Sequence, residues 1–176
     1  IEHIPELVRA GIDSFKIEGR NKTAYYAACV TGAYRAAIDA YRSDPVQYKL
    51  PQFCRDEVDK VSHREYYTGF YFGNQENGQH YGDSQYIREY EVAGMPVECD
   101  AEGHAVFALK NRMFDGEELE LLQPGQPPYV FRAHGMVNDE GEALALFNVP
   151  QMHVHFEFPF PVDPYAILRK KKERPS

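Results

Sequence analysis

The clearest pattern in the first part of the chain is that of one long helix. Apolar residues recur three and four positions apart between about Lys22 and Tyr41, namely at Tyr26, Val30, Ala33, Ala37 and Tyr41. This spacing predicts an amphipathic helix with one buried face. Asn21 or Thr23 can cap its start, and the turn-favouring residues that end it are Ser43, Asp44 and Pro45. A shorter helix is predicted around residues 55–61.

A helix end and a short strand are predicted before the long helix. The segment from Ile4 to Ala10 reads as the last turns of a helix, and Gly11 suits the position that follows a helix. A short apolar stretch follows, made of Ile12, Phe15 and Ile17, and it predicts a strand. The strand leads to a polar triplet, Glu18-Gly19-Arg20. A helix followed by a strand and another helix is typical of an α/β domain.

Beyond Ser84 the pattern changes to short apolar runs separated by turns. The runs predict seven strands: Tyr86 to Val92, Met95 to Cys99, His104 to Leu109, Glu118 to Leu122, Tyr129 to Met136, Ala143 to Phe147 and Met152 to Phe158. The turns between them contain glycine, which adopts the positive φ that tight connections need. Strands of this number and length favour a small β-barrel.

The predicted fold class is therefore mainly β with an α/β remnant. We expect residues 1–45 to be the end of an α/β domain, 46–83 a connector, 84–170 the β-barrel and 171–176 a basic tail. A single strand and helix cannot bury their apolar faces alone, because an α/β domain needs a sheet of several strands. We therefore expect the chain to be a fragment, with the rest of that domain preceding Ile1.

Composition and charge indicate which partners and which cellular compartment the protein suits. The 176 residues carry 19 basic and 27 acidic side chains, a net charge of −8, so the protein as a whole does not attract polyanions. The dense basic run from Arg169 to Arg174 is predicted to be a solvated tail. No segment is apolar and long enough to span a membrane, and three dispersed cysteines, Cys29, Cys54 and Cys99, favour a reducing, cytoplasmic setting without membrane partners.

The polar triplet after the predicted strand is the first candidate site. Glu18 and Arg20 would lie where a strand of an α/β barrel ends, the edge at which substrate-binding side chains converge. A guanidinium there can bind an anionic metabolite through two parallel hydrogen bonds. Lys16 is a weaker member of the same group. The alternative is a structural ion pair.

A second candidate site combines a histidine, an arginine and an aromatic run. His63, Arg64 and Tyr67 could neutralise and stack on a single-stranded RNA loop, because unpaired bases are bound on aromatic and arginine planes. The alternative is packing between domains by Tyr66, Phe70 and Phe72. Binding of RNA further predicts one basic face formed by Arg55, Lys60, Arg64, Arg88, Lys110, Arg112 and Arg132.

Other reactive residues give weaker patterns. His153 and His155 are two positions apart on a predicted strand and would share a face, with His134 as a third histidine across the barrel, but lining or surface roles are favoured over a metal site. The chain has no G-x-S-x-G or H-E-x-x-H motif, and Cys54 beside Arg55 is expected to be an inert thiol. No catalytic residue or metal ligand is assigned.

Several stretches of the sequence resemble the collagenase-like U-32 peptidase family. They are GIDSFKIEGR at 11–20, SHREYYTGFYFG at 62–73, YIREY at 86–90, KNRMFDGEELELLQP at 110–124 and DPYAILRK at 163–170. The resemblance implies a TIM-like barrel, whose last strand and helix would be residues 1–45, followed by a C-terminal β-barrel. The form of residues 62–73 is most similar to the branch that hydroxylates a tRNA wobble uridine.

The resemblance also implies partners and cofactors. Members act on tRNA or rRNA with prephenate as a required metabolite, and several hold an iron–sulfur cluster, although the three cysteines here do not reproduce the cluster spacing. No cofactor is therefore assigned to this chain, and it is expected to be inactive alone. Two other functions stay open: a peptidase whose β-barrel shapes access to substrate, and a structural module that orders the protein or forms a homo-oligomer.

Overall fold

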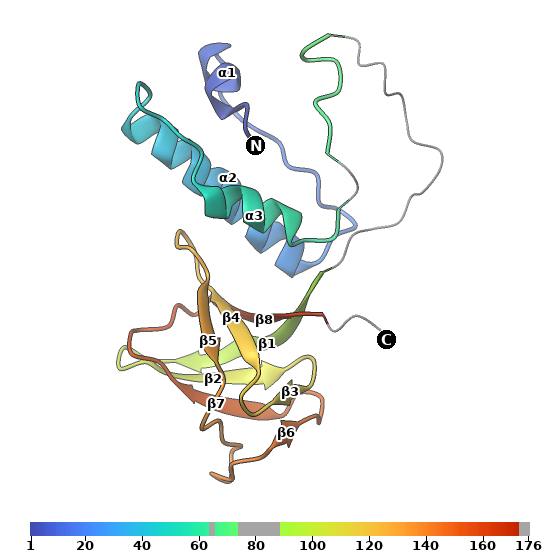
Figure 1. The fold of residues 1–176 in the computed structure, drawn as a ribbon, viewed down its shortest axis with the longest axis vertical. Helices are drawn as coiled ribbons and strands as arrows, with labels where there is room; N and C mark the ends of the chain where they lie inside the picture. Colours follow the sequence, from blue (N-terminus) through green and yellow to red (C-terminus); the bar gives the residue numbers. More distant parts are fainter. Residues whose placement is uncertain (64–65, 74–88, 173–176) are drawn as a thin grey trace.

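The computed structural model describes residues 1–63, 66–73 and 89–172, which form a helical part and a β-rich part. Three helices, α1 (Ile4–Arg9), α2 (Ala24–Ser43) and α3 (Gln52–Asp59), gather at one end of the molecule. A curled antiparallel sheet forms the other end, and α2 and α3 lie across the side of it that faces them (Figure 1). None of the helices in the described ranges is long and apolar enough to cross a membrane.

Helix α2 follows from its sequence pattern. The Thr23 hydroxyl accepts a hydrogen bond from the Tyr26 amide at 3.2 Å, so Thr23 rather than Asn21 caps the helix. Its buried residues are Cys29 and four members of the predicted stripe, Val30, Ala33, Ala37 and Tyr41, whereas Tyr26 is half-buried. The helix packs mainly on α3. The prediction of a long helix is confirmed, and the short helix is confirmed with a start three residues earlier, at Gln52.

The strand predicted at residues 12–17 is wrong. These residues follow α1 and Gly11, which has a φ of +78°, but they adopt no regular structure. A strand needs the backbone of a neighbour for its hydrogen bonds, and no strand in the described ranges pairs with this segment. Every strand pair that the structure describes is antiparallel, so the described residues do not show the remnant of a parallel barrel.

Six strands form one sheet in the order β5-β4-β8-β1-β2-β7, and two more form a small ribbon, β3-β6. Their bounds are β1 Tyr90–Cys99, β2 His104–Leu109, β3 Met113–Phe114, β4 Glu118–Leu122, β5 Tyr129–Arg132, β6 Leu146–Phe147, β7 His153–Glu157 and β8 Ile167–Lys171. The predictions for β2 and β4 are confirmed to the residue. In the described residues the first two predicted strands form one strand, β1, whose register with its neighbours shifts at two places along its length. Residues 86–88 of the first predicted strand lie outside the described residues.

Two strands were missed, and in the described residues the sheet does not close into the predicted barrel. The ribbon strand β3 and the strand β8 did not stand out in the pattern, and β5 and β6 are shorter than predicted. The sheet curls until aromatic side chains of its edge strands meet, with the rings of Phe131 on β5 and Phe156 on β7 6.1 Å apart. No ladder joins β5 to β7 in the described ranges, so the architecture is a curled six-stranded sheet, a half-barrel.

The turn between β1 and β2 shows why glycine is required at one position. Asp100 accepts hydrogen bonds from three successive amides at 2.9–3.0 Å, those of Glu102, Gly103 and His104. Gly103 has a φ of +103°, and a Cβ atom there would collide with the Phe158 carbonyl oxygen. The predicted turn at residues 100–103 is therefore confirmed, and any larger residue at 103 would displace the chain around Phe158.

The basic run at residues 169–174 begins inside the fold. Strand β8 lies between β4 and β1, and its alternation sends Leu168 into the hydrophobic core and Arg169 to the opposite face, toward the helices. Arg169 is completely buried and Lys170 is 3% exposed. The prediction of a solvated tail is wrong for these two residues, because the apolar residues before them, Ala166 to Leu168, make this segment a central strand.

Candidate functional site

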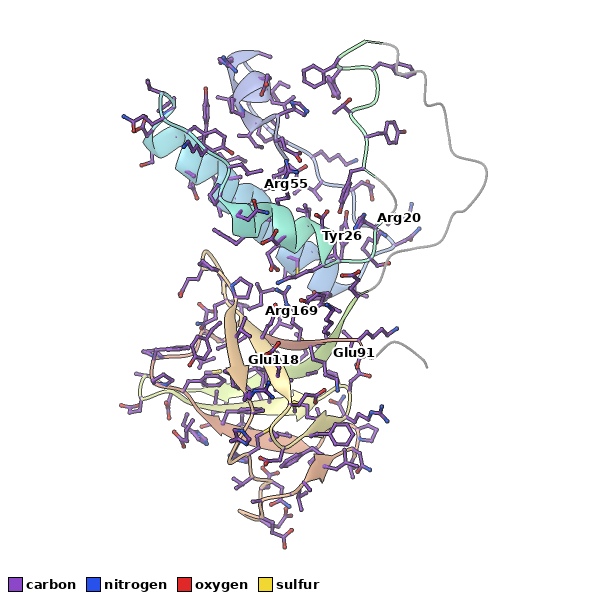
Figure 2. The ribbon with its side chains drawn as sticks, viewed as in Figure 1. Arg20, Tyr26, Arg55, Glu91, Glu118 and Arg169 are labelled. Carbon is purple, nitrogen blue, oxygen red and sulfur yellow. The ribbon has the colours of Figure 1, made fainter. Side chains whose placement is uncertain are left out.

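The predicted site at Lys16, Glu18 and Arg20 lies in the exposed segment before α2. The Glu18 carboxylate accepts a hydrogen bond from the Arg20 amide at 2.9 Å and pairs with the Lys16 ammonium at 3.5 Å. Glu18 therefore shapes the turn locally. The Arg20 side chain is exposed, and in the described part of the chain no acidic side chain pairs with its guanidinium (Figure 2). The three residues are close in space, as predicted, with Arg20 able to receive an anion.

The predicted aromatic site is only partly exposed. Tyr66 donates a hydrogen bond to the Val58 carbonyl at 2.7 Å and stacks on the His63 ring at 4.4 Å, so both residues pack against the helical part. Tyr67, Phe70 and Tyr71 are between 78% and 86% exposed. Arg64 lies outside the described residues. The alternative of packing between domains is therefore wrong for Phe70, and three neighbouring aromatic side chains remain open to a ligand.

A buried ion cluster, which the sequence pattern did not predict, joins the helices to the sheet. The Arg169 guanidinium donates two hydrogen bonds to Glu57 of α3, at 2.5 and 2.6 Å, and two to Glu120 of β4, at 2.6 and 2.9 Å. Lys60 bridges the same carboxylates, at 3.2 Å from Glu57 and 3.0 Å from Glu120. Two cations thus balance two anions. Figure 2 shows Arg169 between the sheet and the helices.

The electrostatics of the cluster follow from burial and pairing. Burial opposes the charged form of Glu120, but Arg169 and Lys60 outweigh it, so the pKa of this carboxyl is lowered. Burial also opposes the charge on Arg169, and the hydrogen bonds to Glu57 overcome it, so the pKa of the guanidinium is raised. Glu120 lies directly opposite Arg169 in the β4–β8 pair, which puts both on the face toward the helices. Alternation along β4 and β8 was the signal that could have found this cluster.

The cysteines do not fit an iron–sulfur cluster or a nucleophile. Burial raises the pKa of the Cys29 thiol to about 12 and that of Cys54 to about 11, so both are protonated at neutral pH. Cluster ligands and nucleophiles are thiolates. Cys99 also has a raised pKa, with burial as the main cause. Within the described ranges no group of three or more His, Cys, Asp or Glu residues is arranged to hold a metal.

The histidines form a chain with one aspartate. The His155 ring contacts His104 at 3.2 Å and Asp139 at 2.8 Å, and His153 lies 3.1 Å from the same Asp139 carboxylate. The hydrogen bond from His155 is the main reason that the pKa of Asp139 is lowered. His134 contacts Asp115 instead, at 3.5 Å. His153 and His155 share a face, as predicted, and Asp139 pairs with both.

Among the described residues, the members of the predicted basic face do not gather in one place. Arg55 pairs with Glu2 at 2.6 Å, Lys60 belongs to the buried cluster, and Arg132 donates to the Gly116 carbonyl. Arg88, like Arg64, lies outside the described residues. Only Lys110 and Arg112 come together, in a pocket of about 470 Å³ whose other lining residues are Glu91, Asn111, Asn148, Lys170 and Lys172. This pocket is the one place in the described structure where several members of the predicted set and of the basic run meet.

Comparison with known proteins places both parts of the chain in one family. Residues 1–81 match peptidase family U32, and residues 88–169 match the C-terminal domain of the same family. The solved C-terminal domain of a U32 peptidase from Geobacillus thermoleovorans is 26% identical, with a TM-score of 0.42, over 46% of this chain and 99% of that domain.

Curated relatives match over most of the chain. A Bacillus subtilis protein named tRNA hydroxylation protein P1 is 30% identical over 98% of this chain and 41% of its own length. The Escherichia coli tRNA hydroxylation protein P is 33% identical over 83% of this chain and 32% of its own length. A Methanocaldococcus jannaschii protein named an uncharacterized protease is 51% identical over 72 residues, 41% of this chain and 17% of that protein. The chain thus spans less than half the length of these relatives.

Proposed function

Because this chain belongs to peptidase family U32, we propose that the protein acts in tRNA hydroxylation, at the wobble uridine. The observation that carries the proposal is the match to the B. subtilis tRNA hydroxylation protein P1, which extends over 98% of the chain and so includes the helical part, the aromatic segment and the curled sheet. The E. coli relative of the same name supports it over 83% of the chain. A protein with this function would act in the cytoplasm.

The exposed aromatic residues support a role in holding RNA. Tyr67, Phe70 and Tyr71 are neighbours in sequence and highly exposed, whereas aromatic side chains elsewhere in the curled sheet pack against one another. An unpaired base stacks on such a ring with a gain of about 1–3 kcal/mol. A wobble uridine lies in a single-stranded loop, the kind of RNA that proteins bind through splayed bases. We assign base stacking to these rings, and to His63 and Arg64, their neighbours in the sequence, a supporting role in neutralising the RNA.

The segment around Arg20 suits the anionic metabolite that the reaction requires. The Glu18 turn holds the Arg20 backbone, and the Lys16–Glu18 pair leaves the guanidinium of Arg20 as the positive group that faces solvent. Prephenate carries two carboxylates, and guanidinium binds a carboxylate in a bidentate manner. We assign Arg20 to this ligand.

Mass spectrometry of tRNA nucleosides tests the proposal. Cells that lack the gene are complemented with the wild type or with a Glu18→Ala, Arg20→Ala double variant. The proposal predicts that hydroxylated wobble uridine disappears on deletion, returns with the wild type and stays at least tenfold lower with the double variant. Unchanged tRNA modification on deletion would contradict the proposed function, and full recovery with the double variant would remove Glu18 and Arg20 from it.

The name of the M. jannaschii relative favours a second candidate function, a peptidase. The raised thiol pKa values of Cys29 and Cys54 argue against a cysteine nucleophile in the described part of this chain. Incubation of the intact gene product with denatured collagen, followed by mass spectrometry of the released peptides, separates the two functions. Specific cleavage that persists after affinity and size-exclusion purification would favour the peptidase.

A further inference from the structure

We propose that His104 and His155 form a binding site for one divalent transition-metal ion, and that Zn²⁺ is the ion that suits it. The two histidines lie on the neighbouring strands β2 and β7 of the curled sheet. Their facing nitrogens, Nε2 of His104 and Nδ1 of His155, are 3.2 Å apart. Neutral imidazole nitrogen is a common ligand of Zn²⁺. The proposal goes beyond the proposed function and does not depend on it.

Strand alternation places both histidines on the outer face of the sheet. Ala105, next to His104, and Val154, next to His155, lie in the hydrophobic core, so the two histidines point the other way. In the β2–β7 ladder His155 lies opposite Val106, which makes it a diagonal neighbour of His104. The backbone of both ligands is therefore fixed by the sheet before an ion arrives. The pair joins two strands, and the spacing of histidines along one strand did not reveal it.

The separation of the two nitrogens fits one metal ion between them. A Zn–N bond is about 2.0–2.1 Å long, so an ion bound to nitrogens 3.2 Å apart has an N–Zn–N angle of about 100°. This is close to the tetrahedral angle of about 109° that Zn²⁺ adopts. The ring centroids are 5.4 Å apart, so the rings meet at their edges and do not stack. Without an ion, the same two nitrogens share one hydrogen bond.

Each histidine has an aspartate beside its other ring nitrogen. The Asp139 carboxylate lies 2.8 Å from Nε2 of His155, and the Asp100 carboxylate lies 3.9 Å from Nδ1 of His104. The contact with His155 lowers the pKa of Asp139, so this carboxylate is ionised and favours a proton on Nε2. Nδ1 of His155 is then left with its lone pair toward the ion. A carboxylate behind the imidazole is the usual arrangement around a metal-bound histidine, because it fixes the tautomer and raises the basicity of the ligand.

Water completes the coordination of the ion. The side chains of His104 and His155 are 34% and 25% exposed, so solvent reaches the space beside them. In the part of the chain that the structure describes, no set of three or more His, Cys, Asp or Glu residues could hold an ion, so the pair acts without a third protein ligand. His153 instead turns its Nδ1 to the other oxygen of Asp139, at 3.1 Å. Closed structural zinc sites have four protein ligands, whereas an ion held by two exchanges with solvent.

Zinc titration of the intact gene product tests the proposal. Metal-free protein is titrated with Zn²⁺ at neutral pH in a calorimeter, and the wild type is compared with His155→Ala and His104→Ala. The matched control is His134→Ala, an exposed histidine that contacts Asp115 and lies outside the pair. We expect the wild type and the control to bind one more equivalent of Zn²⁺ than either pair variant. Asp139→Asn should keep this equivalent but bind it about 10–100-fold more weakly.

The imidazole nitrogens give a second, direct readout by nuclear magnetic resonance of protein with isotope-labelled histidine. Zn²⁺ should shift the signals of His104 Nε2 and His155 Nδ1, each identified by its loss in the corresponding variant, and leave His134 unchanged. No shift in the two rings would show a hydrogen-bonded pair only and overturn the proposal. A shift that needs millimolar Zn²⁺ would show adventitious binding and overturn it too. Equal numbers of bound ions in the wild type and the pair variants would place the zinc elsewhere, with the same consequence.

Discussion

Two cationic regions of the molecule share strand β8 and use positive charge in opposite ways. Arg169 points toward the helices, where it is fully buried and bound to two carboxylates. The pocket on the other side of the strand holds Lys110, Arg112 and Lys172, which are exposed. The positive charge of the first region is neutralised inside the protein, whereas the second region carries its positive charge at the surface. Lys170 shares features of both regions: it is buried, like Arg169, and it donates to the Arg112 carbonyl in the loop of the pocket.

The comparison shows that partners, rather than sequence position, decide what a basic residue does. Arg169, Lys170, Lys171 and Lys172 are consecutive, but strand alternation and the neighbouring strands give them different surroundings. A buried charge persists only with its counter-charge, and removing one member leaves the other unpaired. An exposed cation can be removed with little effect on the fold. The predictions below test this contrast, from the largest effect on stability to the smallest.

Replacing Arg169 with alanine should strongly destabilise the protein. The change leaves Glu57 and Glu120 buried with Lys60 alone to compensate them, and breaking such a pair costs about 3–5 kcal/mol of unfolding free energy. Urea denaturation measures the loss. The matched control is Lys171→Ala, an exposed residue two positions along the same strand, which should change stability by no more than about 0.5 kcal/mol. Similar losses for the two variants would show that the ion cluster does not hold the helices to the sheet.

Lys170→Met should affect both regions. The variant keeps the length of the side chain but leaves the Arg112 carbonyl and Glu117 without their donor, at a cost of about 1–3 kcal/mol. It should also weaken tRNA binding, because the loop at 110–112, which carries two members of the basic face that RNA binding predicts, is no longer fixed. Urea denaturation and tRNA titration on the same preparation check the two effects. A stable variant with normal tRNA affinity would show that Lys170 positions nothing.

Acid should weaken the ion cluster. The pKa of Glu120 is lowered in the folded protein from its ordinary value of 4.5, so its contribution to stability is present above pH 4.5 and is lost as pH falls below it. Unfolding free energies measured between about pH 6 and pH 3 should therefore fall less steeply in Glu120→Gln than in the wild type. Parallel pH profiles would contradict the lowered pKa.

The Lys110→Ala, Arg112→Ala variant should keep its stability within about 0.5 kcal/mol, because both side chains are exposed and the bonds that hold the loop involve backbone atoms, Asn111 and Lys170. Thermal melting compared with the wild type checks this. A large loss would mean that the pocket cations serve the fold, as Arg169 does, and the contrast between the two regions would disappear.

The elements that were predicted well from the sequence are those whose structure is determined by residues within the element itself. Helix α2 has its own stripe and its own cap, and β2 and β4 alternate between turns. The strand at 12–17 failed because a strand depends on a neighbour that no short pattern reveals. Strand β8 was missed because four basic residues conceal the alternation that begins at Ala166. The burial of Arg169 depends on Glu57, 112 residues away.

The candidate site shows the same limit. The proximity of Lys16, Glu18 and Arg20 could be predicted because they are neighbours in the chain. The basic face could not, because which cations are neutralised depends on distant acids: Glu2 for Arg55, and Glu120 for Lys60. Lys110 and Arg112 lie together, and the two lysines that line the same pocket, Lys170 and Lys172, come from a segment that was interpreted as a tail.

The most direct test of the account measures hydroxylated wobble uridine in tRNA from cells whose only copy of the gene carries Lys110→Ala and Arg112→Ala, beside cells that carry Arg42→Ala and Lys49→Ala at exposed positions outside the pocket. The account predicts a marked loss of the modified nucleoside in the first cells and a wild-type level in the second, with equal amounts of folded protein in both. Wild-type levels in both would contradict the account, since these exposed side chains would then serve no RNA substrate.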